Sequence, residues 1–159
     1  MANNCYIDLY ITTRTKWEAD KIADILAKNI QEANKKNEGA FIGSETRYIF
    51  DAGVINHTPV TVKVEGWVKW RVNYTEIKDI IDWINTFVSV TKINMRYEET
   101  DMYLYGEYIY NNTGRKGKKL CDKYVEEKDF PPDFNNENYY EELEQIFQKK
   151  ATVKYIPFH

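Results

Sequence analysis

Between Val60 and Tyr110 the chain reads VTVKVEGWVKW, RVNYTEIKDIIDWINTFVS, VTKINMRYEET and DMYLYGEYIY, and the period of its apolar residues changes twice. In the first and third parts every second residue is apolar, as in a strand with one buried face. In the second part apolar residues recur three and four positions apart, as in an amphipathic helix. The stretch therefore predicts a strand, a helix, a strand and one further strand.

The first of these strands, Val60–Trp70, has two unlike faces. Valines and a glycine point one way, and charged or aromatic side chains point the other way, namely Lys63, Glu65, Trp67 and Lys69. The following helix begins after Asn73, which has cap spacing to Glu76, and runs to about Ser89. Its apolar stripe contains Ile77, Ile80, Ile81, Ile84, Phe87 and Val88.

Segments on both sides add further elements. Cys5–Thr12 alternates apolar and polar residues and predicts a strand, and a helix follows at Lys16–Lys35, where Thr15 and Glu18 have capping-box spacing. The other expected elements are strands at Thr46–Asp51, Thr91–Tyr97, Met102–Tyr110 and Leu120–Val125, turns at Gly53–Pro59 and Glu98–Asp101, a helix at about Asn136–Lys150, and an extended tail.

The order strand, helix, strand, strand, helix, strand predicts an α+β fold. We expect a ferredoxin-like βαββαβ sandwich, with an antiparallel sheet, two helices on one face, and extra C-terminal strands and a helix. The prolines at Pro131 and Pro132 interrupt regular structure. We therefore expect a core domain with an extra hairpin at residues 1–128, and a C-terminal appendage at 129–159 that packs on it.

The composition is typical of one globular domain. With 159 residues, of which 43% are hydrophobic, the chain can bury a core without disulfides or a structural metal. Cys5 and Cys121 lack the paired spacing of a zinc site and favour a reducing compartment. No apolar run approaches the roughly 18 residues of a membrane span, so we expect a cytoplasmic protein. The net charge of −3 disfavours nucleic-acid binding through phosphates.

Side chains for common catalytic centres are few. The serines and histidines of the chain are Ser44, Ser89, His57 and His159, and none lies in a pattern typical of a catalytic triad. The segment 114–119, GRKGKK, lacks the spacing and the Ser or Thr of a phosphate loop, and is expected to be a hairpin turn. We therefore predict no enzymatic activity, no catalytic residues, no metal and no cofactor.

Three carboxylates on the predicted strands are candidates for binding a metal ion. Asp8, Glu65 and Glu107 would approach one another if their strands were neighbours, and clustered carboxylates can bind magnesium. Lysines of the strand Val60–Trp70 share that face with Arg96, however. We therefore expect cross-strand ion pairs there rather than a metal.

The second face of the predicted sheet is rich in rings and charges: Tyr6, Asp8, Tyr10, Lys63, Glu65, Trp67, Lys69, Arg96, Tyr103, Tyr105 and Glu107. Three interpretations remain open. Exposed rings could stack bases, as in RNA-recognition modules, although VEGWVKW is not their RNA-binding motif and the acidic side chains repel phosphates. The C-terminal helix could cover part of the face. The face could also bind a protein, since Tyr, Trp and Arg are enriched at binding hot spots.

Four segments carry a resemblance to known proteins. Through VEGWVKW, EIKDIIDWI, INMRYEET and MYLYGEYIY, residues Cys5–Tyr110 resemble small ferredoxin-like proteins carried by plasmids and phages. By its length, composition and tail, the whole chain resembles type II-A anti-CRISPR proteins, which act against an RNA-guided CRISPR nuclease.

The resemblance implies a non-enzymatic inhibitor that binds the HNH domain of a type II CRISPR effector nuclease and blocks the conformational change needed for cleavage. It implies a monomer in a bacterial host's cytoplasm, without membrane or direct nucleic-acid binding. The expected contact residues are Trp67, Lys69, Tyr103, Tyr105 and Glu107 on the sheet, with a basic rim of Arg115, Lys116 and Lys118. The alternative is a single-stranded nucleic-acid-binding module that uses the aromatic face, and a metal-dependent nuclease or transferase ranks third.

Overall fold

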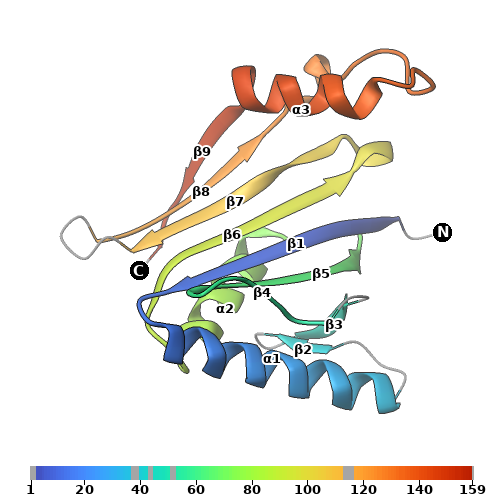
Figure 1. The fold of residues 1–159 in the computed structure, drawn as a ribbon. Coiled ribbons are helices and arrows are strands. Elements are labelled where there is room, and N and C mark those ends of the chain that lie inside the picture. Colours follow the sequence, from blue (N-terminus) through green and yellow to red (C-terminus); the bar gives the residue numbers. More distant parts are fainter. Residues whose placement is uncertain (1–2, 37–39, 43–44, 51–52, 113–116, 159) are drawn as a thin grey trace.

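The computed structural model describes residues 3–36, 40–42, 45–50, 53–112 and 117–158. Three α-helices and nine strands form an α+β fold in this part of the chain (Figure 1), and the predicted class is confirmed. The helices are α1 (Lys16–Lys36), α2 (Tyr74–Asn85) and α3 (Tyr139–Lys150). The strands are β1 (Asn4–Thr13), β2 (Ala40–Ile42), β3 (Glu45–Phe50), β4 (Ile55–Thr58), β5 (Thr61–Lys69), β6 (Val90–Glu99), β7 (Leu104–Asn112), β8 (Lys118–Tyr124) and β9 (Thr152–Ile156).

The described strands lie in one antiparallel sheet with β1 near its middle. Their order is β2-β3-β5-β1-β6-β7-β8-β9, and β4 pairs with β5 as well. On one side β1 pairs with β5, where Leu9 lies opposite Val64, and on the other side it pairs with β6, where Leu9 lies opposite Met95. The apolar residues of these three strands therefore fall on the same face of the sheet.

That apolar face is covered by α1 and α2, and the principal core lies between the two layers. The strands contribute Cys5, Ile7, Leu9, Ile11, Val62, Val64, Val68, Ile93 and Met95, and the helices contribute Ala19, Ile22, Leu26, Ile77, Ile80, Ile81 and Ile84, all at most 1% exposed. Each fully buried aliphatic side chain contributes on the order of 1.5–3 kcal/mol. The alternation in β1 and β5 and the stripes of both helices are thus confirmed.

Both predicted helix starts are capped as expected. The backbone N–H of Glu76 donates to Asn73 Oδ1 at 2.9 Å and the Asn73 N–H donates to Glu76 Oε1 at 3.1 Å, which makes a full capping box. At α1, the Glu18 N–H donates to Thr15 Oγ1 at 3.2 Å. The predicted end of the second helix at Ser89 is wrong, because α2 stops at Asn85 and the chain must turn before β6 starts at Val90.

One predicted turn and the start of one predicted strand differ from the structure. In the expected turn region Gly53–Pro59, residues 55–58 form β4, because Ile55 and Asn56 pair with Lys63 and Val62 of β5. The hairpin therefore needs only Pro59 and Val60 for its turn. The expected strand at Met102–Tyr110 begins later, at Leu104, because residues 100–102 form a 3₁₀ turn that the Glu99 side chain caps through the Asp101 N–H.

The C-terminal residues add a helix on the opposite face and a strand at the edge. A second apolar cluster joins α3 to the sheet and consists of Tyr105, Val125, Phe130, Tyr139, Leu143 and Phe147. In Figure 1, α3 lies at the β8 end of the sheet, far from α1. The residues expected to be an extended tail form β9, which pairs with β8 from Tyr124↔Thr152 to Leu120↔Ile156.

Gly106 provides a test of this packing. It lies directly opposite Tyr97 in the β6–β7 pair, and a Cβ atom on it would come within 2.5 Å of both the Tyr97 hydroxyl and the Lys123 carbonyl oxygen. We therefore expect Gly106→Ala to lower the free energy of unfolding by about 1–3 kcal/mol in urea denaturation. Gly53→Ala is the matched control, because no atom lies within 4 Å of its added Cβ, and it should change stability by less than about 0.5 kcal/mol. Equal stabilities of the two variants would contradict the packing around Gly106.

Candidate interaction surface

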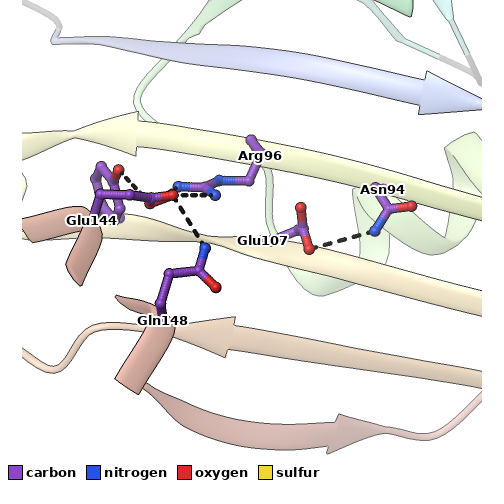
Figure 2. A network of polar contacts seen from close by, with 6 residues as sticks. Asn94, Arg96, Glu107, Glu144 and Gln148 are labelled. Atoms are coloured by element: carbon purple, nitrogen blue, oxygen red, sulfur yellow. Dashed lines mark hydrogen bonds and ion pairs between the residues drawn. The ribbon is translucent and has the colours of Figure 1, made fainter. Parts of the chain in front are cut away.

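The open face of the sheet, defined as the face away from α1 and α2, holds α3 through Arg96 of β6. Its guanidinium Nη1 and Nη2 donate to Glu144 Oε1 and Oε2, both at 3.0 Å, as Figure 2 shows. The Tyr105 hydroxyl donates to Glu144 Oε2 at 3.0 Å, and Gln148 donates to Oε1 at 3.4 Å. A planar guanidinium and a carboxylate bind most strongly in this two-bond geometry.

Aromatic rings complete the contact between α3 and the sheet. The Arg96 guanidinium lies 4.2 Å from the ring centroid of Phe147 and 5.2 Å from that of Tyr105, and Lys123 Nζ lies 4.5 Å from the Phe147 centroid. Burial, with the nearby Glu144 carboxylate, raises the pKa of Tyr105 to about 12, although Arg96 opposes the shift. Tyr105 therefore stays protonated at neutral pH and remains a hydrogen-bond donor.

Beside α3, part of the open face has no described helix over it. We call it the uncovered face and define it by Tyr6, Asp8 and Tyr10 of β1 and Lys63, Glu65 and Trp67 of β5. The register places Tyr6 directly opposite Trp67, Asp8 opposite Glu65 and Tyr10 opposite Lys63. The Tyr6 side chain is 56% exposed, so at least one ring of this set is available to a partner.

A cleft of about 300 Å³ separates the uncovered face from α3. Its lining includes Tyr6, Asp8, Tyr10, Arg96, Glu98 and Glu144. Burial and the neighbouring Glu65 raise the pKa of Asp8, and burial and the neighbouring Asp8 raise that of Glu98, against the lowering effect of Arg96. The nearby cations are already engaged, since Arg96 binds Glu144 and Lys63 Nζ lies 2.6 Å from Glu65 Oε1. The cleft is therefore an acidic site that repels phosphate groups.

The predicted sheet contacts do not form one patch. Trp67 is half-buried on the uncovered face, and Lys69 is exposed at the end of the same strand. Tyr105 is only 8% exposed because α3 covers it, so our expectation of an exposed ring there is wrong. Glu107 is half-buried and accepts a hydrogen bond from Asn94 Nδ2 at 3.4 Å (Figure 2).

Tyr103 and Lys118 lie away from the uncovered face. Tyr103 belongs to a left-handed position (φ 54°) before β7, and its ring packs edge-on against Phe130 with centroids 5.3 Å apart. Lys118 is exposed at the start of β8, with its Nζ 5.9 Å from the Phe158 ring centroid. The predicted positions Arg115 and Lys116 lie outside the described residues.

The three carboxylates considered for magnesium do not assemble. Asp8 and Glu65 are cross-strand neighbours, but Arg96 separates Asp8 from Glu107, because it lies opposite both in the β1–β6 and β6–β7 pairs. Among the described residues, no group of three or more His, Cys, Asp or Glu side chains could hold a metal ion. Among the described residues, Lys63 pairs with Glu65 along one strand, and Arg96 pairs with Glu144 of α3.

A second polar cluster was not foreseen and lies on the helix side of the sheet. The Asp122 carboxylate of β8, 2% exposed, accepts hydrogen bonds from the Tyr97 hydroxyl at 2.6 Å and the Tyr74 hydroxyl at 3.2 Å. These residues line a cleft of about 360 Å³, together with Arg71. The alternation Leu120, Asp122, Tyr124 was the available signal, because it places the carboxylate on the same face as a core leucine.

Comparison with protein-family models, with curated proteins and with solved structures finds no match to this chain. Among the described residues, no helix combines the length and apolar character needed to cross a bilayer.

Glu144→Gln tests how α3 is attached. Burial alone would raise the pKa of Glu144, but the hydrogen bonds and charge of Arg96 lower it below the ordinary 4.5. A carboxyl whose folded pKa is depressed stabilises the fold above its unfolded pKa, and this contribution disappears as the pH falls through the folded value. The Glu144 side chain is 38% exposed, so we expect a loss of only about 1 kcal/mol at pH 7. Urea unfolding should show that the difference from wild type shrinks as the pH falls below the ordinary carboxyl pKa of 4.5. Glu141→Gln, exposed on the same helix, is the control, and an equal loss there would refute the attachment through Arg96.

Asp122→Asn should show the opposite pH dependence. Burial raises the pKa of Asp122 against the hydrogen bonds of Tyr97 and Tyr74, which lower it. With the folded pKa above the unfolded value, the carboxylate opposes folding at neutral pH, and wild type gains stability as the pH falls and the group is protonated. The stability of wild type relative to the Asn variant should therefore rise between pH 7 and about pH 4 in urea titrations. A difference that is flat, or that falls, would count against this assignment.

Proposed function

We propose that this protein works by binding another protein through its uncovered face, and that it has no catalytic activity of its own. The observation that carries the proposal is the position of α3. It occupies β6, β7 and β8 through Arg96, Tyr105 and Lys123, and leaves the ring-rich part on β1 and β5 open. An exposed tyrosine and a half-buried tryptophan, Tyr6 and Trp67, lie there beside charges of both signs, and these residue types are enriched at protein interfaces.

The electrostatics favour a protein over a nucleic acid as the partner. Asp8, Glu65 and Glu98 place carboxylates beside the rings of Tyr6 and Tyr10, and the neighbouring cations already have carboxylate partners. Single-strand binding modules pair stacking rings with free cations along the backbone path. A phosphate chain laid across the rings of the uncovered face would meet like charge instead.

The strand order supports the finer description of the fold as ferredoxin-like. Within the sheet, β3-β5-β1-β6 is a four-stranded antiparallel unit. The helix α1 follows β1 in the chain, α2 connects β5 to β6, and both helices cover the same face. We propose this unit as the common frame, to which β7, β8, β9 and α3 are additions. Fold alone indicates no function.

The identity of the partner rests on the resemblance to type II-A anti-CRISPR proteins. We propose that a monomer of this protein, carried by a phage or another mobile element, binds the HNH domain of a type II CRISPR effector nuclease in the bacterial cytoplasm. Such a nuclease cuts only after HNH docks onto the target strand. A ligand with greater affinity for the undocked state lowers the population of the docked state and so blocks cutting without competing for DNA.

Trp67→Ala tests the surface and the partner together. The wild-type protein should co-elute with a type II nuclease in size-exclusion chromatography and should suppress its DNA cleavage. Removal of the Trp67 ring should weaken the complex by about 2 kcal/mol, or roughly thirtyfold in Kd by calorimetry. Trp17→Ala is the matched control, because Trp17 is 68% exposed on α1, in the layer on the other face of the sheet, and it should bind like wild type.

Two results would overturn the proposal. Absence of co-elution with every nuclease in a panel of type II enzymes would remove the proposed partner. A change of tryptophan fluorescence on titration with single-stranded RNA or DNA, lost in Trp67→Ala but kept in Trp17→Ala, would favour the nucleic-acid-binding alternative.

A further inference from the structure

Among the described strands, β9 forms an edge of the sheet. It pairs with β8 on one side, it is the last strand in the sheet order, and Figure 1 shows no strand beside its other side. In an edge strand, alternate residues direct their backbone N–H and C=O groups away from the sheet. This edge is therefore able to accept one more strand by main-chain hydrogen bonds.

Two apolar side chains of β9 are open to solvent. Val153 is 48% exposed and Tyr155 is 75% exposed, and the register places both on the open face, beside Lys123 and Cys121 of β8. A strand that only had to be shielded from aggregation would place polar residues at these two positions. Their exposure gives an added strand something apolar to contact.

The same edge is basic, although the chain as a whole carries a net charge of −3. Lys154 lies on β9 with its Nζ 5.4 Å from the Tyr74 ring centroid, and Lys118, Lys119 and Lys123 lie on the neighbouring strand β8, where Lys123 also packs against Phe147 of α3. None of these four lysines forms an ion pair with a carboxylate of the described residues. Asp122 of β8 lies directly opposite Lys154, whose charge acts to lower its pKa, but its buried carboxylate is hydrogen-bonded by two tyrosine hydroxyls.

This charge decides between the possible occupants of the edge. A second copy would bring its own Lys154 toward this one, and like charges opposite each other across a strand pair are destabilising. Lys119 and Lys123 share the open face with Val153 and Tyr155, so an acidic strand would gain chiefly from Lys154, on the helix side of β9. The lysines thus disfavour self-association and favour an acidic partner.

We propose that β9 binds an extended acidic segment of a partner protein as an additional strand. The main chain of the segment pairs with β9, its acidic side chains lie beside Lys154 on the helix side, and its apolar side chains lie beside Val153 and Tyr155. This site is separate from the uncovered face, because three strands, β6, β7 and β8, lie between β1 and β9. It does not depend on the function proposed above.

A fluorescein-labelled ten-residue peptide that alternates valine and glutamate tests the site, because it places all glutamates on one side of a strand. Fluorescence anisotropy should show binding that weakens with added salt. Lys154→Glu should reduce the affinity about tenfold or more, whereas Lys28→Glu, the same charge change on exposed α1, should leave it near wild type. Amide hydrogen exchange should show new protection in residues 152–156.

The outcomes separate this proposal from others. A peptide with proline at its central valines lacks the required N–H groups and should not bind; equal binding of that peptide overturns strand addition. A second test is whether a twelve-nucleotide single-stranded DNA competes with the peptide for wild-type protein and fails to bind Lys154→Glu. That result would show a nucleic-acid site and would also overturn the proposal. Trp67→Ala should bind the peptide normally, so a failure of this site is distinguishable from a failure of the uncovered face.

Discussion

The placement of one arginine on an exposed sheet face organises the C-terminal half of this molecule. Arg96 comes from a central strand, so its guanidinium would lie among polar neighbours in water if nothing covered it. Glu144 binds it through two parallel hydrogen bonds, and Phe147 and Tyr105 flank it with their rings. Guanidinium groups tolerate such partial burial because they are weakly hydrated and planar. The result is a second apolar cluster on the face that would otherwise be open.

This contact also sets which surfaces remain available. With α3 seated over β6, β7 and β8, the rings on β1 and β5 stay open on one side of the helix, and the β9 edge stays open on the other. The two surfaces differ in charge: carboxylates dominate near Tyr6 and Tyr10, whereas lysines dominate beside β9. A single chain with a modest net charge thus presents two chemically distinct areas to partners.

Local sequence patterns were enough for the central layers of the fold. The alternation in Cys5–Ile11 and Val62–Val68 and the stripe of Ile77–Ile84 each describe an element that buries one side against a large partner, and periodicity records that kind of burial. The edge elements β4 and β9 leave almost no such trace. Every residue of β4 is exposed and only Ile156 of β9 is buried, so neither strand alternates between core and solvent. Their pairing depends on neighbours that no local pattern contains.

The position of a candidate surface residue could be predicted only where its strand is regular, because a regular strand fixes which face each side chain takes. Trp67 and Lys63 lie on the expected face because β5 is regular throughout. Tyr103 does not lie on that face, because the 3₁₀ turn at 100–102 delays the start of β7 to Leu104 and leaves Tyr103 outside the strand. Tyr105 is on the expected face, but its burial depends on a helix nearly forty positions later, and such tertiary contacts are invisible to periodicity. Asp122 occupies a core position in the alternation of β8, but a search for apolar residues does not detect a buried aspartate.

The connection between α3 and β9 consists of Ala151 alone. A one-residue link limits how far the helix and the edge strand can move apart, so we expect them to open together. A ligand that stabilises β9 in the sheet should then also stabilise α3 in its contact with Arg96. Because Glu144 of α3 lines the acidic cleft, we expect a segment bound at the sheet edge to change the shape of that cleft very little but to keep it closed on the α3 side for longer.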